Sequence, residues 1–314
     1  MGSHAGIIIP AWVRGLVGLP RPREVMKRES IKYVLRKMRE HGYEYEATRD
    51  PEKFKFFYQR MYLPYIRSRH GDTVFVHSWD QVKAHFDAGE LILVKKQDKY
   101  LCGNIISYKD TIARMPFLGV LDGNHDLVAE GVLAAVYECF LQHVEKKGLL
   151  SADLGESRAF IKDGVLAFKK KFGYTIFNTS IHKYLVRIVS DNPATRAFLE
   201  NNPFIFQHAG NCYGAVFLPP SVPPSLDTLH SVHRRFSYPG LNEVIAIFFA
   251  ADPAASQPQL DSTTPINPAT TKSTLPHDQP RTRTLIHADY APMFGPLGNL
   301  AIAHAIAILP PLVE

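Results

Sequence analysis

Cysteine is scarce in this sequence, which has only three in 314 residues. Cys102, Cys139 and Cys212 lie far apart, and no two of them have the spacing of zinc ligands, so we expect no metal site. Their odd number argues against a disulfide framework, because such frameworks use cysteines in pairs. A reducing compartment fits this usage best, and we predict a cytoplasmic protein.

The sequence also lacks the short motifs of several large enzyme classes. It contains no G-x-x-x-x-G-K-[ST] phosphate loop, no G-x-G-x-x-G turn, no G-x-S-x-G nucleophile turn and no H-E-x-x-H zinc helix. Kinase, Rossmann dehydrogenase, serine hydrolase and zincin interpretations therefore have no support.

Long apolar runs without interruption are rare as well. The first twenty residues have no basic n-region, and Pro10 and Arg14 interrupt their apolar stretch, so we expect no signal peptide. Residues 295–313 are apolar, but Asn299, His304 and flanking prolines argue against a membrane span. We expect no stable membrane insertion and predict that this segment packs on the body of the protein or on a partner.

What the sequence does contain is enough apolar material for a core and a mild excess of positive charge. Hydrophobic residues make up 46% of the chain, and the formal net charge is +6. The length predicts one large domain or two modest ones. A basic balance of this size permits an anionic ligand such as a phosphate or a nucleotide, although most basic proteins bind no nucleic acid.

Residues 24–41 carry much of the positive charge in a helical pattern. Between residues 21 and 41 eight Lys or Arg stand against three Glu, and apolar residues recur at helical spacing. Such a helix could follow the phosphates of an RNA. A solvated amphipathic surface helix is the commoner explanation, and the interleaved glutamates favour it.

The coarse pattern predicts a mixed α/β (α+β) chain with a mostly antiparallel sheet flanked by helices. Three β-rich runs separated by Gln-Asp and Lys-Asp turns predict an antiparallel meander. The predicted elements, in chain order, are a helix over 24–41, a strand over 43–48, helices over 51–66 and 79–88, the meander strands over 91–96, 99–109 and 111–120, a long helix over 125–147, a strand over 149–155, a short helix from 164, and one or two strands within 174–190.

The predicted domain layout has five segments. A main domain spans 24–189 after an N-terminal extension over 1–23, and a small α/β appendage follows over 190–251. Residues 252–284 are rich in Pro, Ser and Thr and cannot bury enough apolar surface to offset the entropy of ordering, so we predict a disordered linker. An apolar tail over 285–314 completes the chain.

The stretch DGVLAFKKKFGY, residues 163–174, predicts a short amphipathic helix. Asp163 stands at the N-cap position and Gly173 at that of a left-handed C-cap, and lysines near a C-terminus suit the helix dipole. On the residues alone, the lysines at 169–171 form either a solvated face or a cluster that faces a phosphate.

Three passages, in order, resemble the FemAB-like branch of the GNAT-type acyltransferases. They are SIKYVLRKMREHGYEYEAT, EKKGLLSADLGES and IKDGVLAFKKKFGY, within residues 30–177. The resemblance implies a β-bulged central strand that separates from its neighbour. It further implies that an acyl-CoA, or the acceptor end of an aminoacyl-tRNA, lies in the gap and gives its acyl group to an amine.

The predicted catalytic residues are Asp153 and Lys169, which the resemblance suggests, and His70, which is proposed for its chemistry. Asp153 ends the strand LLSAD, where a carboxylate can face the acceptor amine; a cap on the following turn is the alternative. Lys169 stands where many GNAT enzymes have a tyrosine, and a lysine there can neutralise a phosphate or polarise an oxyanion. His70 is a candidate base because its pKa is close to neutrality, although a lone loop histidine more often has no such role.

The predicted co-substrate site comprises Gly123, Asn124, His125, Arg158 and Lys170. GNAT enzymes bind the pyrophosphate of CoA with backbone N–H groups at a helix N-terminus, and the corresponding turn here is LDGNHDLVAEG. This turn departs from the family because it carries two aspartates and no basic cradle, and acid repels a pyrophosphate.

We therefore predict an N-acyltransferase that moves an acyl group from acyl-CoA to an amine of an amino sugar, a peptide or a cell-envelope precursor. One alternative replaces CoA with aminoacyl-tRNA, which makes tRNA a partner. Another is a binding module of GNAT fold without catalysis. The sequence predicts no oligomeric state.

Overall fold

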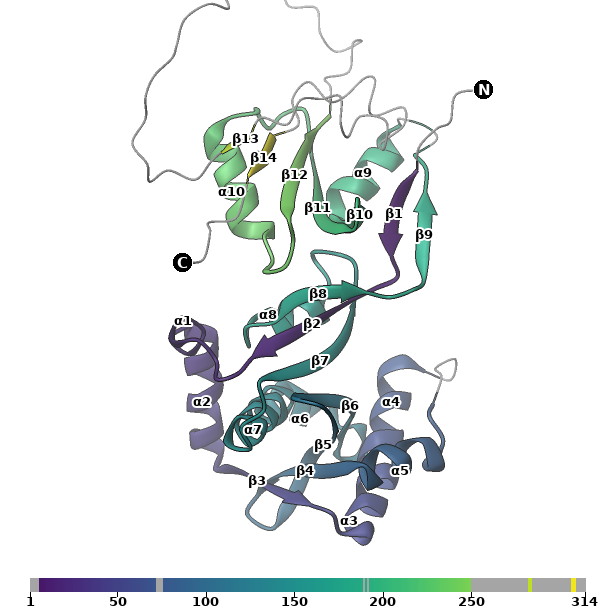
Figure 1. The fold of residues 1–314 in the computed structure, drawn as a ribbon, viewed down its shortest axis with the longest axis vertical. Coiled ribbons are helices and arrows are strands. Elements are labelled where there is room, and N and C mark those ends of the chain that lie inside the picture. Colours follow the sequence, from purple (N-terminus) through teal and green to yellow (C-terminus); the bar gives the residue numbers. More distant parts are fainter. Residues whose placement is uncertain are drawn as a thin grey trace, which may run out of the picture. The chain divides into compact units, whose positions relative to one another are not determined.

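The computed structural model describes residues 6–71, 76–188, 190, 192–249, 282–283 and 306–308. The chain packs as two compact units, and each contains a seven-stranded sheet (Figure 1). The first unit comprises residues 13–157 and 164–178, and the second comprises residues 1–12, 158–163 and 179–314. Both sheets are largely antiparallel and flanked by helices, which confirms the predicted mixed α/β class.

The sheet of the first unit is a meander extended through a parallel pair. Its neighbours follow in the order β3 (Tyr43–Thr48), β4 (Gly89–Lys96), β5 (Lys99–Lys109), β6 (Ile112–Val120), β7 (Ser151–Arg158), β2 (Trp12–Gly18) and β8 (Thr175–Thr179). Strands β3 to β6 pair antiparallel, so the predicted meander is confirmed. Gln97 and Asp110 adopt φ of 54° and 53° in its two hairpins, the left-handed backbone that tight hairpins use.

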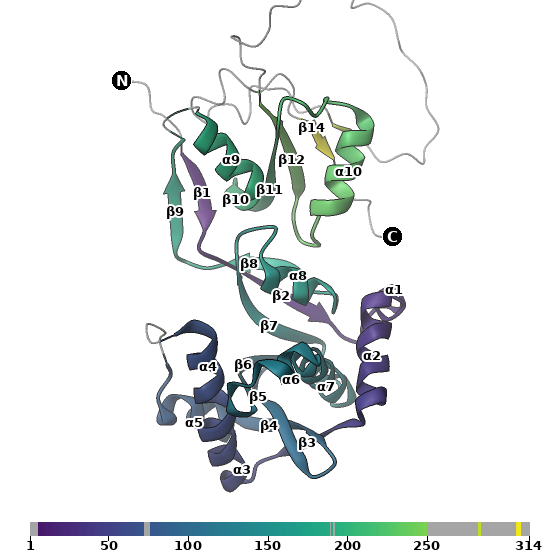
Figure 2. The same ribbon diagram turned by 180° about the vertical axis from the view of Figure 1, so that it is seen from behind.

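Helices cover both faces of this sheet. On one face, α7 (Val132–Lys146) packs on β4 and β5, with α2 (Glu29–His41) beside it (Figure 2). On the other, α5 (Trp79–Asp87) and the π-helix η1 (Phe57–Tyr62) enclose an aromatic core. The remaining helical elements are α1 (Arg23–Met26), α3 (Pro51–Phe56), α4 (Leu63–His70), η2 (Leu121–Gly123), α6 (His125–Ala129) and α8 (Gly164–Lys170).

Two predicted helices are each divided in the structure. The helix expected over 125–147 consists of α6 and α7, because Gly131 between them adopts φ of 94°. A right-handed helix cannot continue through a left-handed residue. The helix expected over 24–41 begins as α1 and restarts as α2 after Arg28, whose extended backbone has ψ of 137°.

Strands β6 and β7 pair over only three residues and then separate, and we call this point the fork. The parallel register runs from Ile112–Ser151 to Arg114–Asp153 and stops there. Directly after Arg114, β6 is also bulged against β5. Pro116 lies in this bulge and has no N–H for a strand ladder, and a bulge bends the strand that carries it. The structure thus has the bulged, separated pair that the GNAT resemblance implied.

The second unit has its own sheet and helices. Its strands follow in the order β13 (Thr282–Arg283), β14 (Ile306–Ile308), β12 (Glu243–Phe248), β11 (Asn211–Leu218), β10 (Phe204–His208), β1 (Ile7–Pro10) and β9 (Lys183–Val186). Helices α9 (Pro193–Asn201) and α10 (Leu226–Phe236) pack on its central strands.

Apart from Thr282–Arg283 and Ile306–Ile308, the predicted linker over 252–284 and apolar tail over 285–314 lie outside the described residues. Within the part of the chain that is described, no helix combines the length and the apolar character that crossing a bilayer requires.

Candidate functional site

Asp153 is the charged centre of the fork. It is the last residue of β7 paired with β6, and it is 3% exposed. Its Oδ2 lies 3.6 Å from Nε of Arg14 on β2 and 3.5 Å from Nε of Arg114 on β6. Because β6, β7 and β2 are neighbours, Arg114, Asp153 and Arg14 form one line across the sheet, which we call the arginine row. The two guanidiniums compensate the charge of a carboxylate that burial would otherwise destabilise.

Strand β7 changes direction at Gly155, directly after the row. Gly155 adopts φ of 78°, and its N–H donates to Oδ1 of Asp153 over 2.8 Å. In a regular strand, residues 153 and 156 face opposite sides. Here Oε1 of Glu156 nevertheless lies 3.8 Å from Nη2 of Arg14. The left-handed glycine therefore lets both carboxylates approach the same arginine, and Glu156 remains 41% exposed.

The two arginines of the row keep most of their hydrogen-bonding capacity. Their contacts with the carboxylates are ion pairs longer than hydrogen bonds, and each Nε is buried without a hydrogen-bond partner. Their side chains are 36% and 39% exposed, so the Nη ends reach solvent. Two other arginines of this unit are each held by two hydrogen bonds to one carboxylate: Arg21 makes two bonds of 2.7 Å to Glu138, although its Nε is also buried without a hydrogen-bond partner, and Arg60 makes two of 2.8 Å to Asp122.

Lys169 reaches β7 from the end of α8. The residue is 2% exposed, and its Nζ donates to the carbonyl of Glu156 over 2.7 Å. The same Nζ lies 5.6 Å from the ring centroid of Tyr174, whose hydroxyl donates to the carbonyl of Gly155 over 3.0 Å. Burial, aided by the charge of Asp153, raises the pKa of Tyr174, which therefore acts as a neutral donor. Lys169 and Tyr174 thus fix the backbone of β7 where it turns.

In the turn after β6, where the resemblance would place a CoA pyrophosphate, backbone N–H groups already donate hydrogen bonds to a side chain of the turn itself. Asn124 caps α6, because its Oδ1 accepts from the N–H groups of Asp126 at 2.7 Å and Leu127 at 3.4 Å. These are the groups that would otherwise bind a phosphate at a helix N-terminus.

The rest of this turn is packed and acidic. Asp122 is held by Arg60, so that arginine is not available to an anion. A Cβ added to Gly123 would lie 2.8 Å from the carbonyl oxygen of Pro64, which shows that the backbone is already in close contact with α4. The residues of this turn therefore do not fit a pyrophosphate.

The other residues predicted for the site lie apart from the row. His125 begins α6 and is exposed. The carbonyl of Lys170 accepts from Arg28 over 2.9 Å, and burial together with the charge of Arg28 lowers the pKa of Lys170. Arg158 ends β7 and packs with the second unit. His70 ends α4, and its side chain lies outside the described part of the chain. The structure thus brings Asp153 and Lys169 to the turn of β7 at the row, whereas His125 and Lys170 lie on other elements and Arg158 lies at the far end of β7.

Arg14, Arg114 and Glu156 were not among the residues predicted for the site from the sequence. Arg14 was treated as an interruption of the N-terminal apolar run, and Arg114 lies within the predicted strand over 111–120 without an assigned role. A usable signal is that β2, WVRGLVG, and β6, IARMPFLGV, each contain a single charged residue, an arginine. One charge within an apolar strand needs a partner, and only the strand order shows that both find it in Asp153.

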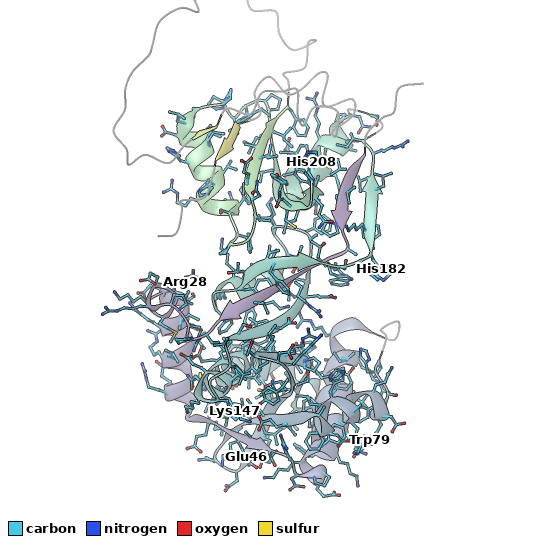
Figure 3. The ribbon with its side chains drawn as sticks, in the orientation of Figure 1. Arg28, Glu46, Trp79, Lys147, His182 and His208 are labelled. Atoms are coloured by element: carbon cyan, nitrogen blue, oxygen red, sulfur yellow. The ribbon has the colours of Figure 1, made fainter. Side chains whose placement is uncertain are left out.

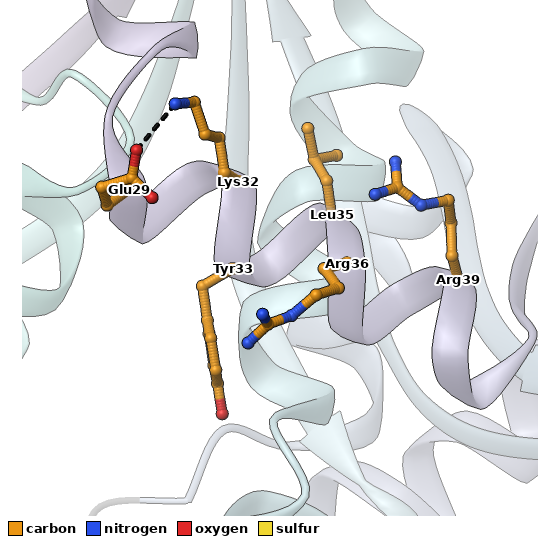
Figure 4. A pocket seen from close by; sticks show the side chains of 6 residues that line it. All are labelled: Glu29, Lys32, Tyr33, Leu35, Arg36 and Arg39. Carbon is orange, nitrogen blue, oxygen red and sulfur yellow. Dashed lines mark hydrogen bonds and ion pairs between the residues drawn. The ribbon is translucent and has the colours of Figure 1, made fainter.

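The exposed face of α2 carries a basic, shallow pocket (Figure 4). The pocket is lined by Glu29, Lys32, Tyr33, Leu35, Arg36 and Arg39. Tyr33 is 53% exposed, and the guanidinium of Arg36 lies 5.3 Å from its ring centroid. Lys32 donates to Glu29 over 2.7 Å. Cations beside an exposed ring suit an RNA, because phosphates pair with the cations and bases stack on the ring, and they equally suit a solvated helix face.

A second charged cluster lies between α7 and the sheet, around Glu90 on β4. Its Oε1 accepts from the hydroxyl of Tyr108 and from Nζ of Lys147, and lies 2.9 Å from Nε2 of His143. Lys147 is labelled in Figure 3. Glu90 is 7% exposed, so the cluster connects α7 to β4 and β5 and offers little access to a ligand. In the described ranges, no group of three or more His, Cys, Asp or Glu is arranged to hold a metal ion.

No protein-family model matches the chain, and no curated protein sequence matches it. Among solved structures, the chain is similar to the C-terminal domain of a candidate lysylphosphatidylglycerol synthetase from Agrobacterium fabrum, with a TM-score of 0.37 and 12% identity over 48% of each chain. It is similar to L-PGS from Bacillus licheniformis, with a TM-score of 0.36 and 10% identity over 48% of this chain and 46% of that one. It is also similar to FemX, with a TM-score of 0.42 and 14% identity over 59% of this chain and 64% of that one. Each match spans less than two thirds of the solved chain, and at these scores it assigns no residue a role.

Proposed function

We propose that the chain is a transferase that moves an acyl or aminoacyl group from an activated carbonyl to an amine. The observation that carries this proposal is the fork, where two parallel strands separate after three residue pairs beside a charged row. Beyond the fork, alternate residues of β6 direct their N–H and C=O groups toward the side that β7 has left. Such groups can bind an extended donor and polarise its carbonyl.

The transfer needs a base and stabilisation of the developing oxyanion. The amine nitrogen bonds to the carbonyl carbon, the bond from that carbon to the leaving oxygen or sulfur breaks, and the leaving group takes up a proton. We assign the proton lost by the amine to Glu156, the half-exposed carboxylate at the fork. Asp153 and Lys169 act as positioning residues, the first through the arginines and the second through the backbone of Glu156.

The donor that fits better is an aminoacyl ester of tRNA. The capped, acidic turn after β6 gives no support to CoA, whereas α2 offers cations and an exposed ring to a nucleic acid. Acyl-CoA stays a prediction to be tested beside it. The acceptor amine is expected on an amino sugar, a peptide or a cell-envelope precursor.

A transfer assay tests the proposal. Purified protein is mixed with radiolabelled aminoacyl-tRNA or acyl-CoA and a pool of amines, and amide products are identified by mass spectrometry. Glu156→Gln should lower the rate by about 100-fold or more, because general base catalysis contributes at least that much. The control Asp87→Asn alters an exposed carboxylate of α5 and should leave the rate unchanged. If no donor gives an amide, the catalytic proposal fails and the binding module remains.

The choice of donor is tested by binding. Replacing Lys32, Arg36 and Lys37 with glutamine should weaken the gel shift of tRNA and reduce its salt dependence, because each lost phosphate contact releases fewer counterions. The control triple variant at Lys55, Lys96 and Lys99 removes the same charge from other exposed positions. Equal weakening by both variants would assign the effect to net charge. A heat of binding in isothermal titration with acetyl-CoA or longer acyl-CoAs would instead favour acyl-CoA as the donor.

A further inference from the structure

The arginine row indicates what kind of acceptor the site takes. Arg14 and Arg114 hold their Nε atoms buried and direct their Nη ends to solvent, and among the described residues neither Nε has a hydrogen-bond partner. Arg21 and Arg60 show how this chain satisfies an arginine that has a purely structural role, with two short bonds to one carboxylate. The guanidinium N–H groups of Arg14 and Arg114 are held near Asp153 by ion pairs and can therefore donate hydrogen bonds to a ligand.

The charges around the row are divided between a buried part and an exposed part. Asp153 is buried and compensates one of the two guanidinium charges. The exposed part then holds the second guanidinium charge and the carboxylate of Glu156, which lies 3.8 Å from Arg14 and compensates that charge, so the four groups together carry no net charge. A guanidinium binds a carboxylate or a phosphate through its fork of N–H groups, and a carboxylate binds an ammonium group. A ligand with both charges complements this surface.

We propose that the acceptor carries a carboxylate or a phosphate close to its amino group, with Arg14 and Arg114 holding the oxyanion and Glu156 facing the amine. This assignment rests on the proposed transfer to an amine. Since Glu156 and Arg14 lie 3.8 Å apart, the amine and the oxyanion of the acceptor are separated by only a few bonds. A simple ammonium group would add one positive charge to these four balanced groups without a counter-charge, so the row selects against it.

Binding of small probe molecules tests the proposed class of acceptor in the absence of any acyl donor. Glycine presents an ammonium group with a carboxylate, and phosphoethanolamine presents one with a phosphate. Ethanolamine presents the amine alone, and acetate presents the anion alone. The readout is the Nε–Hε signals of Arg14 and Arg114 in nitrogen-15 NMR spectra. We expect at least one zwitterion to shift both signals at lower concentration than ethanolamine or acetate. Comparing glycine with phosphoethanolamine shows whether the oxyanion is a carboxylate or a phosphate.

Variants separate recognition from folding. Arg114→Gln should weaken binding of the preferred zwitterion by about 10- to 100-fold, the loss expected for a charge-assisted hydrogen bond. Arg114→Lys keeps a positive charge beside Asp153, so it should fold, yet it should also weaken binding because the planar fork is lost. The control Arg60→Gln removes an arginine that is engaged elsewhere and should leave binding unchanged.

Two results would overturn the inference: no shift with either zwitterion, or equal binding of ethanolamine and no effect of the Arg114 variants. Its failure is distinguishable from that of the proposed function. Transfer that runs equally on amines with and without an oxyanion would refute the acceptor class and leave the transferase. Zwitterion binding without transfer from any donor would leave a recognition site and refute the transferase.

Discussion

Glu90 shows how a single buried carboxylate can stay charged inside this protein. Burial would raise its pKa, but hydrogen bonds from Lys147, Tyr108 and His143 outweigh burial and lower the pKa of Glu90 to about 2, from a usual value of 4.5. A group whose pKa is lower in the folded state stabilises that state above the unfolded value. The contribution disappears as the pH falls toward the folded value.

The acid stability of the protein should therefore depend on Glu90. The wild type should lose stability between about pH 4.5 and about pH 2, whereas Glu90→Gln should show a flatter profile in that window. At neutral pH the variant should already be less stable by about 1–3 kcal/mol, because a charged acceptor of several hydrogen bonds is lost. Urea unfolding across this pH range is the measurement. An identical slope for Glu90→Gln, with Glu44→Gln as the exposed control, would contradict the assignment.

The packing of Tyr174 against β2 depends on a missing side chain. A Cβ added to Gly15 would lie 2.5 Å from the Tyr174 ring, whereas a Cβ added to Gly18 on the same strand meets nothing within 4 Å. Gly15→Ala should destabilise the fold by about 1–3 kcal/mol through overpacking, and Gly18→Ala should change stability by less than about 0.5 kcal/mol. Thermal unfolding measures both. Equal effects would show that the ring can move away at no cost.

At the scale of elements, the ends of α6 and β6 decide what the turn between them can bind. The side chain of Asn124 accepts hydrogen bonds from the first N–H groups of α6, and the charges of Asp122 and Arg60 neutralise one another. The turn is thus a structural closure of the sheet, although its position in the chain is where the family resemblance places a phosphate.

The Asn124 cap can be tested by substitution. Asn124→Ala should lower stability by about 1 kcal/mol, because the N-terminal N–H groups of α6 lose their acceptor. Asn124→Ser supplies another good cap and should retain most of the stability. Urea unfolding compares the two variants. If both lose the same amount, the role of Asn124 lies elsewhere than in capping.

How much of these elements the sequence predicts depends on the range of the interactions involved. The meander follows from local turn residues and alternation, and the left-handed Gly173 is confirmed with φ of 92°. The fork was expected only through the family resemblance, although Pro116 supplies a local reason for it. The arginine row could not be predicted, because Arg14 and Arg114 are far apart in sequence and meet only through the strand order.

At the scale of the molecule, neither unit is a continuous stretch of chain. The backbone passes between the units after residues 12, 157, 163 and 178. Strand β2, from the segment expected as an N-terminal extension, lies between β7 and β8 in the first sheet, and β1 lies between β10 and β9 in the second. The N-terminal residues therefore contribute to both cores.

Truncation at the N-terminus should consequently affect the whole fold. A chain that begins at Arg21 lacks β2, whose Val13 and Val17 are 0% and 1% exposed, and it leaves Asp153 with Arg114 as its remaining arginine. We expect loss of cooperative unfolding, measured by circular dichroism, and of signal dispersion in NMR spectra. Trp12→Ser, at a position 40% exposed, is the control and should unfold cooperatively. A sharp transition in the truncated chain would contradict the role of β2.

The repeated passage of the backbone between the units also constrains how such a protein can change over generations. A single recombination event between two genes replaces everything on one side of a breakpoint. A breakpoint between residues 19 and 174 would divide both sheets at once, and one after residue 179 would still separate β1 from the rest of the second sheet. Shuffling of one half for a foreign one would require several coordinated breakpoints, so the two halves are expected to be inherited as one block.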